Sequence, residues 1–323
     1  MNSQGHCRNN LSSTLRLVAL VCGGAVLAAT SSFAQQPKKR TNPASKVYFT
    51  DVQGLAEIDT GDRVDELAQR TVYTAQGAVI ETKKAESPED QTRYSSAMVF
   101  SNGTGAFFDT DTRVEMKRFV QEPFVPNRND IDVEPSISQT QAFLSRGAVG
   151  LCTSKLVAGS NMTYQTPHGS VNIRGKRVVI EAAADVTKIS MLEGESTVRA
   201  GETDMGGHAL RAGQQAIIRA GRGGQPSAIE ILTIPPPELP KLEERSTLAC
   251  AAKKTVYFEA RERPNDGLPE VAGADAPVTA FNSDAAGDDI VQQEIVPVTI
   301  VPTTLPTEYT VSPATLVGTN PTP

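Results

Sequence analysis

The sequence predicts a mainly β fold, either an antiparallel β-sandwich or a β-roll of short strands, with one helix near the C-terminus. Short β-branched runs, separated by Gly, Pro and Asn, recur from about residue 46 to residue 234. No helical period appears in this part of the chain. Aromatic residues make up only 5% of the chain and Trp is absent, so we expect a core of Val, Ile, Leu, Ala and a few Phe.

The first 34 residues have the order of a secretory signal. Arg8 and Arg16 precede an apolar run over 17–29, and small residues follow at Ser32 and Ala34. The apolar run is shorter than the roughly 20 residues that span a bilayer. We predict cleavage after Ala34 and export to the periplasm or cell surface, with an uncleaved membrane anchor as the alternative.

The charge balance argues against a nucleic-acid partner. The chain carries 31 Lys and Arg against 37 Asp and Glu, a net charge of −6. Loss of Arg8 and Arg16 with the signal would make the mature chain more acidic still. Phosphate backbones require a surplus of basic residues on one face, so we predict no nucleic-acid partner.

Turn residues divide the N-terminal half into strands. A first strand is expected at 46–50, followed by either a hairpin over 51–65 or a short helix near 62–69. Residues 71–75 and 78–82 alternate around Gln76-Gly77, which predicts a hairpin, and 83–92 should be an exposed loop. Asn102-Gly103 lies between apolar runs and predicts a second hairpin.

The second half continues this pattern up to a proline stop. Residues 121–138 form an excursion or a packed cover, and 140–154 return to strand character. The stretch 166–200 contains three strand-like runs, with a turn at Glu193-Gly194-Glu195. A last strand over 228–234 ends at three prolines, and leucines and alanines near helical spacing predict a helix over 240–253.

These elements divide the chain into five parts. A signal peptide (1–34) and a flexible leader (35–45) precede a β-rich domain (46–234). A proline linker with a short helix and strand follows (235–262). The remainder (263–323) is acidic and rich in Pro and Thr, so we predict a disordered or extended tail.

Several turn and strand patterns resemble the FecR periplasmic domain family over residues 94–220. The best is T-P-x-G-x-V-x-I-x-G at 166–175, followed by a looser strand, Leu-Glu-Gly turn and strand over 188–198. Further likenesses are the Asn-Gly hairpin at 102–103, R-G-x-V at 146–149 and the L-x-x-G-Q turn at 210–214. One departure is Gly175-Lys176-Arg177-Val178, where the family often has Gly-Thr and an aromatic residue.

This resemblance implies a periplasmic β-domain more strongly than it implies the family's signalling role. FecR-type regulators carry a cytoplasmic anti-sigma segment before their membrane span, and at most 16 residues precede the apolar run here. We therefore expect a stand-alone, non-catalytic binding or assembly module that engages an envelope protein or a glycan. The alternative is an envelope signal-sensing subunit that works with a separate membrane anti-sigma or receptor partner.

The sequence offers few residues for catalysis or cofactor binding. His168 and His208 are the histidines of the predicted mature chain, and no local signature joins either of them to a nucleophile. We predict no enzyme activity, no cofactor and no metal. The basic residues Arg174, Lys176 and Arg177 lie close together in sequence and are the candidate binding residues.

Cys152 and Cys250 remain after removal of the signal. An oxidising compartment permits a disulfide between them, but residues so far apart in sequence could equally be buried thiols. Both readings stay open at the level of the sequence.

Overall fold

The computed structural model describes residues 45–84, 94–124, 132–201, 204, 206–221, 228–262 and 293–300. The predicted signal peptide, most of the leader, most of the 83–92 loop and most of the tail lie outside the described residues. The strands are β1 (Lys46–Gln53), β2 (Ala56–Asp59), β3 (Val64–Glu66), β4 (Val72–Thr74), β5 (Val79–Thr82), β6 (Ser95–Phe100), β7 (Gly105–Phe108), β8 (Thr112–Gln121), β9 (Ser138–Cys152), β10 (Asn161–Gln165), β11 (Gly169–Ile173), β12 (Arg177–Ala182), β13 (Val186–Glu193), β14 (Glu195–Ala200), β15 (His208–Arg211), β16 (Gln214–Arg219), β17 (Ala228–Thr233), β18 (Val256–Glu262) and β19 (Gln293–Thr299), with one helix in this part of the chain, α1 (Leu239–Lys253).

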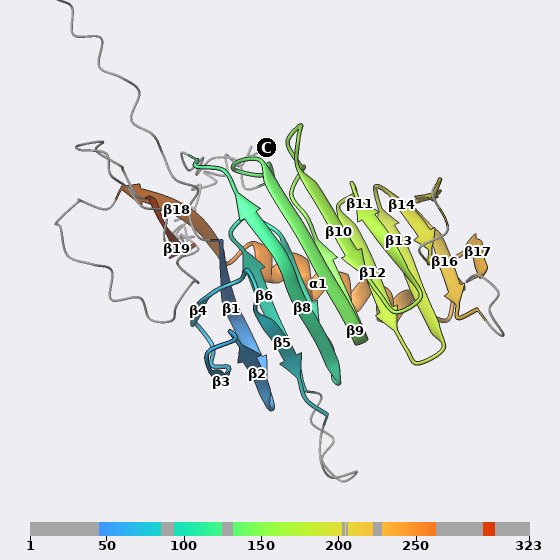
Figure 1. The fold of residues 1–323 in the computed structure, drawn as a ribbon, viewed down its shortest axis with the longest axis horizontal. Helices are drawn as coiled ribbons and strands as arrows, with labels where there is room; N and C mark the ends of the chain where they lie inside the picture. Colours follow the sequence, from blue (N-terminus) through green and yellow to red (C-terminus); the bar gives the residue numbers. More distant parts are fainter. Residues whose placement is uncertain are drawn as a thin grey trace, which may run out of the picture. The chain divides into compact units, whose positions relative to one another are not determined.

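Strands β1 to β17 form two layers that share β9 (Figure 1). One layer, the covered sheet, has the order β4–β1–β6–β7–β9–β12–β13–β16–β17. The other, the open sheet, has the order β3–β2–β5–β8–β9–β10–β11–β14–β15. Every pairing is antiparallel except that of β9 with β10. The predicted mainly β fold is confirmed.

Strand β9 passes from one layer to the other at Gly147. Its first part pairs with β8 and β10 of the open sheet, and its last part, from Gly147, pairs with β7 and β12 of the covered sheet. Gly147 has φ +92°, and a Cβ there would lie 2.3 Å from Oγ1 of Thr112. Both the backbone conformation and the lack of space therefore require glycine.

After β9, hairpins alternate between the layers. β10–β11 and β14–β15 belong to the open sheet, whereas β12–β13 and β16–β17 belong to the covered sheet. The chain changes layer at Gly175 and again at Gly194, which has φ +100°. A Cβ on Gly194 would lie 2.3 Å from Cα of Gly175, so these two crossings pack directly on each other.

The hairpin predicted around Gln76-Gly77 is wrong. β4 pairs with β1 in the covered sheet, whereas β5 pairs with β2 and β8 in the open sheet. The N–H of Ala75 donates to the carbonyl of Ser45, and that of Gly77 donates to the carbonyl of Met116. The turn thus crosses between layers, and strand alternation alone cannot distinguish such a crossing from a hairpin. Of the two readings of 51–69, the structure has the hairpin, β2–β3.

The main core lies between the two layers. Alternate residues of most strands point inward, as the period of two requires. In β8 the buried positions shift by one residue between Met116 and Phe119, where the register with β9 is irregular. The largest fully buried side chains are Tyr164, Phe49, Phe108, Phe119, Ile58, Ile80, Met98, Met116, Leu144, Leu151, Met162 and Ile173.

Helix α1, predicted at 240–253, lies across the outer face of the covered sheet, against β6, β7, β9 and β12 (Figure 1). Its backbone approaches the sheet closely at two glycines. A Cβ on Gly105 would lie 2.1 Å from the carbonyl oxygen of Ala249, and one on Gly150 would lie 2.6 Å from that of Arg245. The helix explains why residues 148–152 of β9 are all buried, since the core covers one face of the strand and α1 covers the other.

No helix in the described ranges has both the length and the apolar character needed to cross a bilayer.

Beyond α1, β18 pairs with β19, which belongs to the predicted tail. Of the two alternatives predicted for the tail, disordered or extended, this segment has the extended one, in a paired strand that the prolines were expected to prevent. Ile295 is buried in one cluster with Phe258, Val256 and Tyr48. Pro297 lies opposite Phe258 and is tolerated because β19 pairs with a single strand.

Replacement of Gly105 by Ala tests the close approach of α1. The added methyl group must displace the helix backbone, so Gly105→Ala should lower the free energy of unfolding by about 1 to 3 kcal/mol in urea denaturation. Gly206→Ala is the matched control, because nothing lies within 4 Å of a Cβ there. Equal stability of the two variants would contradict the packing of α1 described above.

Candidate functional site

The outer face of the open sheet holds a groove of about 780 Å³. Strands β10, β11 and β14 form its floor and residues 155–160 form a wall. We call it the polar groove. Its described lining residues are Lys155, Leu156, Val157, Ala158, Gly159, Ser160, Asn161, Thr163, Ser170, Asn172, Ile173, Arg174, Thr197 and Arg199.

The floor of the polar groove consists of hydroxyl and amide side chains because of strand alternation. Val171 and Ile173 point into the core, which places Asn172 on the outer face. Asn172 pairs in register with Thr163 on β10 and with Thr197 on β14. Its Nδ2 donates to Oγ1 of Thr163 at 3.2 Å and to Oδ1 of Asn161. A row of hydrogen-bonding groups therefore crosses three strands.

Three cations border this floor. Lys155, Arg174 and Arg199 are all exposed, and none of them forms an ion pair with another described residue. No acidic residue is found among the groove's described lining residues. In a chain with a net charge of −6, the polar groove is thus a local region of positive charge.

The buried Glu134 holds the wall of the groove in place. Its backbone N–H donates to the carbonyl of Lys155 at 3.0 Å, and its carboxylate accepts hydrogen bonds from the N–H of Val157 and the hydroxyl of Ser138. Burial raises the pKa of Glu134, and the hydrogen bonds from Ser138, Ser160 and Val157 only partly oppose this.

The structure separates the three candidate basic residues Arg174, Lys176 and Arg177. Arg174 lies before the crossing at Gly175 and lines the polar groove. Lys176 forms an exposed ion pair with Glu193 at 3.1 Å. Arg177 starts β12 in the other layer and contacts α1 through Glu243 and Ser246. Of the three, Arg174 is the one that lines the polar groove.

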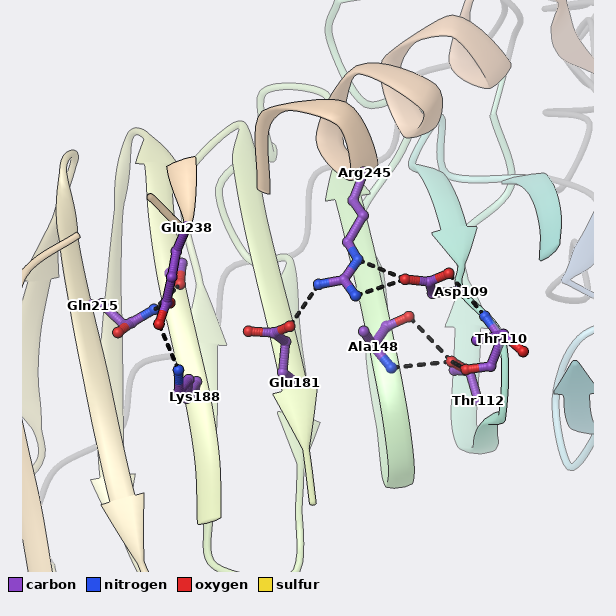
Figure 2. A network of polar contacts seen from close by, with 10 residues as sticks. Asp109, Thr110, Thr112, Ala148, Glu181, Lys188, Gln215, Glu238 and Arg245 are labelled. Atoms are coloured by element: carbon purple, nitrogen blue, oxygen red, sulfur yellow. Dashed lines mark hydrogen bonds and ion pairs between the residues drawn. The ribbon is translucent and has the colours of Figure 1, made fainter. Parts of the chain in front are cut away.

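Polar contacts fix the start of α1 on the covered sheet (Figure 2). Glu238, the residue before the helix, accepts hydrogen bonds from Lys188 of β13 at 2.8 Å and from Gln215 of β16 at 2.9 Å. These two contacts lower the pKa of Glu238, that of Gln215 having the larger effect. The carboxylate binds the sheet and does not cap the helix, which has no side-chain cap.

A buried ion pair fixes the middle of α1. The guanidinium of Arg245 donates to one oxygen of Asp109 at 2.9 and 2.6 Å, and to Glu181 at 2.5 Å (Figure 2). The side chains of Arg245 and Asp109 are only 4% and 7% exposed. Removal of one partner would leave a buried charge unpaired, a change that typically costs about 3 to 5 kcal/mol. A smaller cavity of about 340 Å³ adjoins this pair, and we interpret its charges as structural.

Cys152 of β9 and Cys250 of α1 form a disulfide, with Cα atoms 5.0 Å apart. Of the two readings that the sequence left open, the structure has the bridge. It joins the C-terminal half of the helix to the strand beneath it. Close by, Lys253 pairs with Asp132 at 3.0 Å.

The two histidines lie apart from the polar groove. His168 is buried, and its Nε2 is 3.2 Å from the carbonyl oxygen of Ala183. His208 is exposed and lies 3.4 Å from Asp204. No group of three or more His, Cys, Asp or Glu residues in the described part of the chain could hold a metal ion.

Comparisons with known proteins yield only a distant structural likeness. Neither the protein-family models nor the curated proteins include a match. Two crystal structures described as a "putative anti-sigma factor" from Parabacteroides distasonis are similar to this chain, with TM-scores of 0.35 and 0.34 and 13% identity. Each alignment covers 50% of this chain and 62% of the neighbour's length. A likeness at this level carries no inference about the family or the function of this chain.

Sequence reasoning found Arg174 but missed Arg199 and Lys155. The alternation of Val171, Ile173 and Val198 does indicate that their neighbours face outward. In the structure β11 lies beside β14, in a register that pairs Ser170 with Arg199. This pairing depends on the crossings between layers. The local sequence does not contain that information.

The pH dependence of stability tests the burial of Glu134. Because its pKa is raised in the folded state, its contribution to stability is fully present below the unfolded pKa of roughly 4.3 and is lost as pH rises through the folded value. The stability of the wild type relative to Glu134→Gln, measured by urea denaturation, should therefore fall as the pH rises above about 4. The exposed Glu66→Gln controls for removal of a carboxylate, and a difference that grows with pH would contradict the burial of Glu134.

Proposed function

We propose that this chain is a non-catalytic binding module, exported to the periplasm or cell surface, that holds its ligand in the polar groove. The observation that carries the proposal is the groove itself. Three exposed cations, none of which forms an ion pair with a described residue, border a floor of hydroxyl and amide groups. This groove lies on the outer face of the sheet that α1 does not cover. Polar groups that converge in a large cavity are typical of a binding site.

The composition of the groove supports binding without catalysis. General acid-base catalysis most often uses His, Asp or Glu within hydrogen-bond reach of the substrate. The described lining of the groove contains none of these residue types and no Cys. His168 and His208 contact residues elsewhere in the fold.

The disulfide supports export. Bridges such as Cys152–Cys250 form and persist in oxidising compartments and are rare in the cytosol. The basic and apolar order of residues 1–34 has the same implication.

Binding to isolated cell envelopes tests the proposal. Purified protein should co-sediment with an envelope fraction, and Asn172→Ala should weaken this binding about fivefold through the loss of hydrogen bonds from the floor. Gln69→Ala is the control, because Gln69 is an exposed amide far from the groove in the sheet order.

Two outcomes would count against the proposal, and a third would identify the kind of ligand. Equal binding by Asn172→Ala and the wild type would show that the polar groove is not the binding site. If a bound polymer is shorter after its release from the protein, the non-catalytic part is contradicted. Loss of binding after protease treatment of the envelopes would show that the ligand is a protein, which the signal-sensing alternative also requires.

A further inference from the structure

We infer that the ligand of the polar groove is a polysaccharide that carries carboxylate groups. This inference rests on the proposed function, since it names the ligand class of the same groove. Three properties of the groove lead to it: the placement of its cations, the chemistry of its floor and the lack of free backbone groups.

The cations lie at opposite ends of the uncharged floor. Arg199 of β14 is opposite Ser170 of β11. Arg174 follows β11, four residues after Ser170, and therefore lies on the same face of the sheet as Ser170. Its N–H donates to the carbonyl of Glu195 at 3.1 Å, which extends the pairing of β11 with β14. At about 3.3 Å per residue, the backbone positions of the two arginines are about 13 Å apart along the strand. Asn172 and Thr197 occupy the space between them.

This arrangement fits a chain of sugars better than a single small ion. Hydroxyl and amide side chains match the many hydroxyl groups of a sugar ring. Two arginines separated by an uncharged floor match acidic groups that recur along a polymer. The planar guanidinium donates two parallel hydrogen bonds to a carboxylate.

A phosphorylated ligand fits the groove less well. Phosphate sites commonly use backbone N–H groups at a helix N-terminus or in a glycine-rich turn. The floor strands β10, β11 and β14 each pair with a strand on both sides, so their N–H groups are used within the sheet. The side chains of Lys155, Arg174 and Arg199 are the groove's charged donors among the described residues.

An acidic peptide also fits less well. Extended peptides bind sheets through a free edge, where main-chain hydrogen bonds give affinity. The floor of the polar groove has no free edge. Apart from the fully buried Ile173, its apolar lining residues Leu156, Val157 and Ala158 belong to the wall, and none carries an aromatic ring. Peptide recognition usually depends on buried aromatic or aliphatic anchors, which this floor does not accommodate.

The negative net charge of the whole molecule predicts how binding should depend on salt. An acidic protein repels polyanions in general, so binding should depend on the local cations of the groove and should weaken as salt screens them. Neither arginine has a side-chain partner among the described residues, so their replacement should leave the fold intact.

The test measures binding of the full chain to polygalacturonate, a polymer with one carboxylate on each sugar, by isothermal titration calorimetry. We expect binding by the wild type at low salt and a loss of about tenfold in the double variant Arg174→Met/Arg199→Met. The matched control, Arg63→Met/Arg219→Met, removes two exposed arginines outside the groove and should bind like the wild type. Circular dichroism verifies that both variants fold.

Further arms of the experiment separate the alternatives. Methyl-esterified polygalacturonate, which lacks the charges, should not bind. Equal binding of the ester, with sensitivity to Asn172→Ala but not to the double arginine variant, would overturn the carboxylate inference and leave the proposed function standing. Preference for dextran sulfate over polygalacturonate would overturn the inference that the ligand's acidic groups are carboxylates. Preference for poly-glutamate would overturn the inference that the ligand is a polysaccharide. Absence of binding to all four polymers would overturn the inference, while envelope binding sensitive to Asn172→Ala would still support the function.

Discussion

The close approach of α1 to the covered sheet is the constraint on which the rest of the arrangement depends. The helix backbone comes so near to β7 and β9 that only glycine fits at positions 105 and 150. Polar contacts at Glu238 and Arg245, and the bond between Cys152 and Cys250, then fix the helix at its start, middle and end. The outer face of β6, β7, β9 and β12 is therefore buried beneath α1, whereas the larger groove lies on the outer face of the open sheet.

The open sheet is suited to carry the groove by the way its strands are joined. The crossings at Gly175 and Gly194 carry the chain between the two layers, and in each hairpin the residues that face the core are mostly apolar. Asn172, Thr163 and Thr197 form one row as a result. The buried carboxylate of Glu134 accepts a hydrogen bond from the N–H of Val157 and so fixes the segment that forms the wall of the groove.

The class of fold, the Asn-Gly hairpin and the helix could be predicted from the sequence, because each depends on a local pattern. Alternation identifies a strand, and three prolines followed by helix formers mark the boundary before α1. Pairings set by distant residues could not be predicted in this way. The turn at Gly77 has the pattern of a hairpin but joins two layers, and Arg245 meets Asp109 across 136 positions of the chain. The basic cluster of Arg174, Lys176 and Arg177 is adjacent in sequence, yet the crossing at Gly175 sends its members to different surfaces.

Mapping of the disulfide is the most direct test of the claim that α1 is part of the β-domain and buries one of its faces. The unreduced protein is alkylated, digested and analysed by mass spectrometry, and the account predicts a cross-linked peptide pair that contains Cys152 and Cys250. Reduction before alkylation should release the two peptides, each carrying a label. Alkylation of Cys152 and Cys250 in the folded, unreduced protein would contradict the account, because the two sulfurs would then not be joined across helix and sheet.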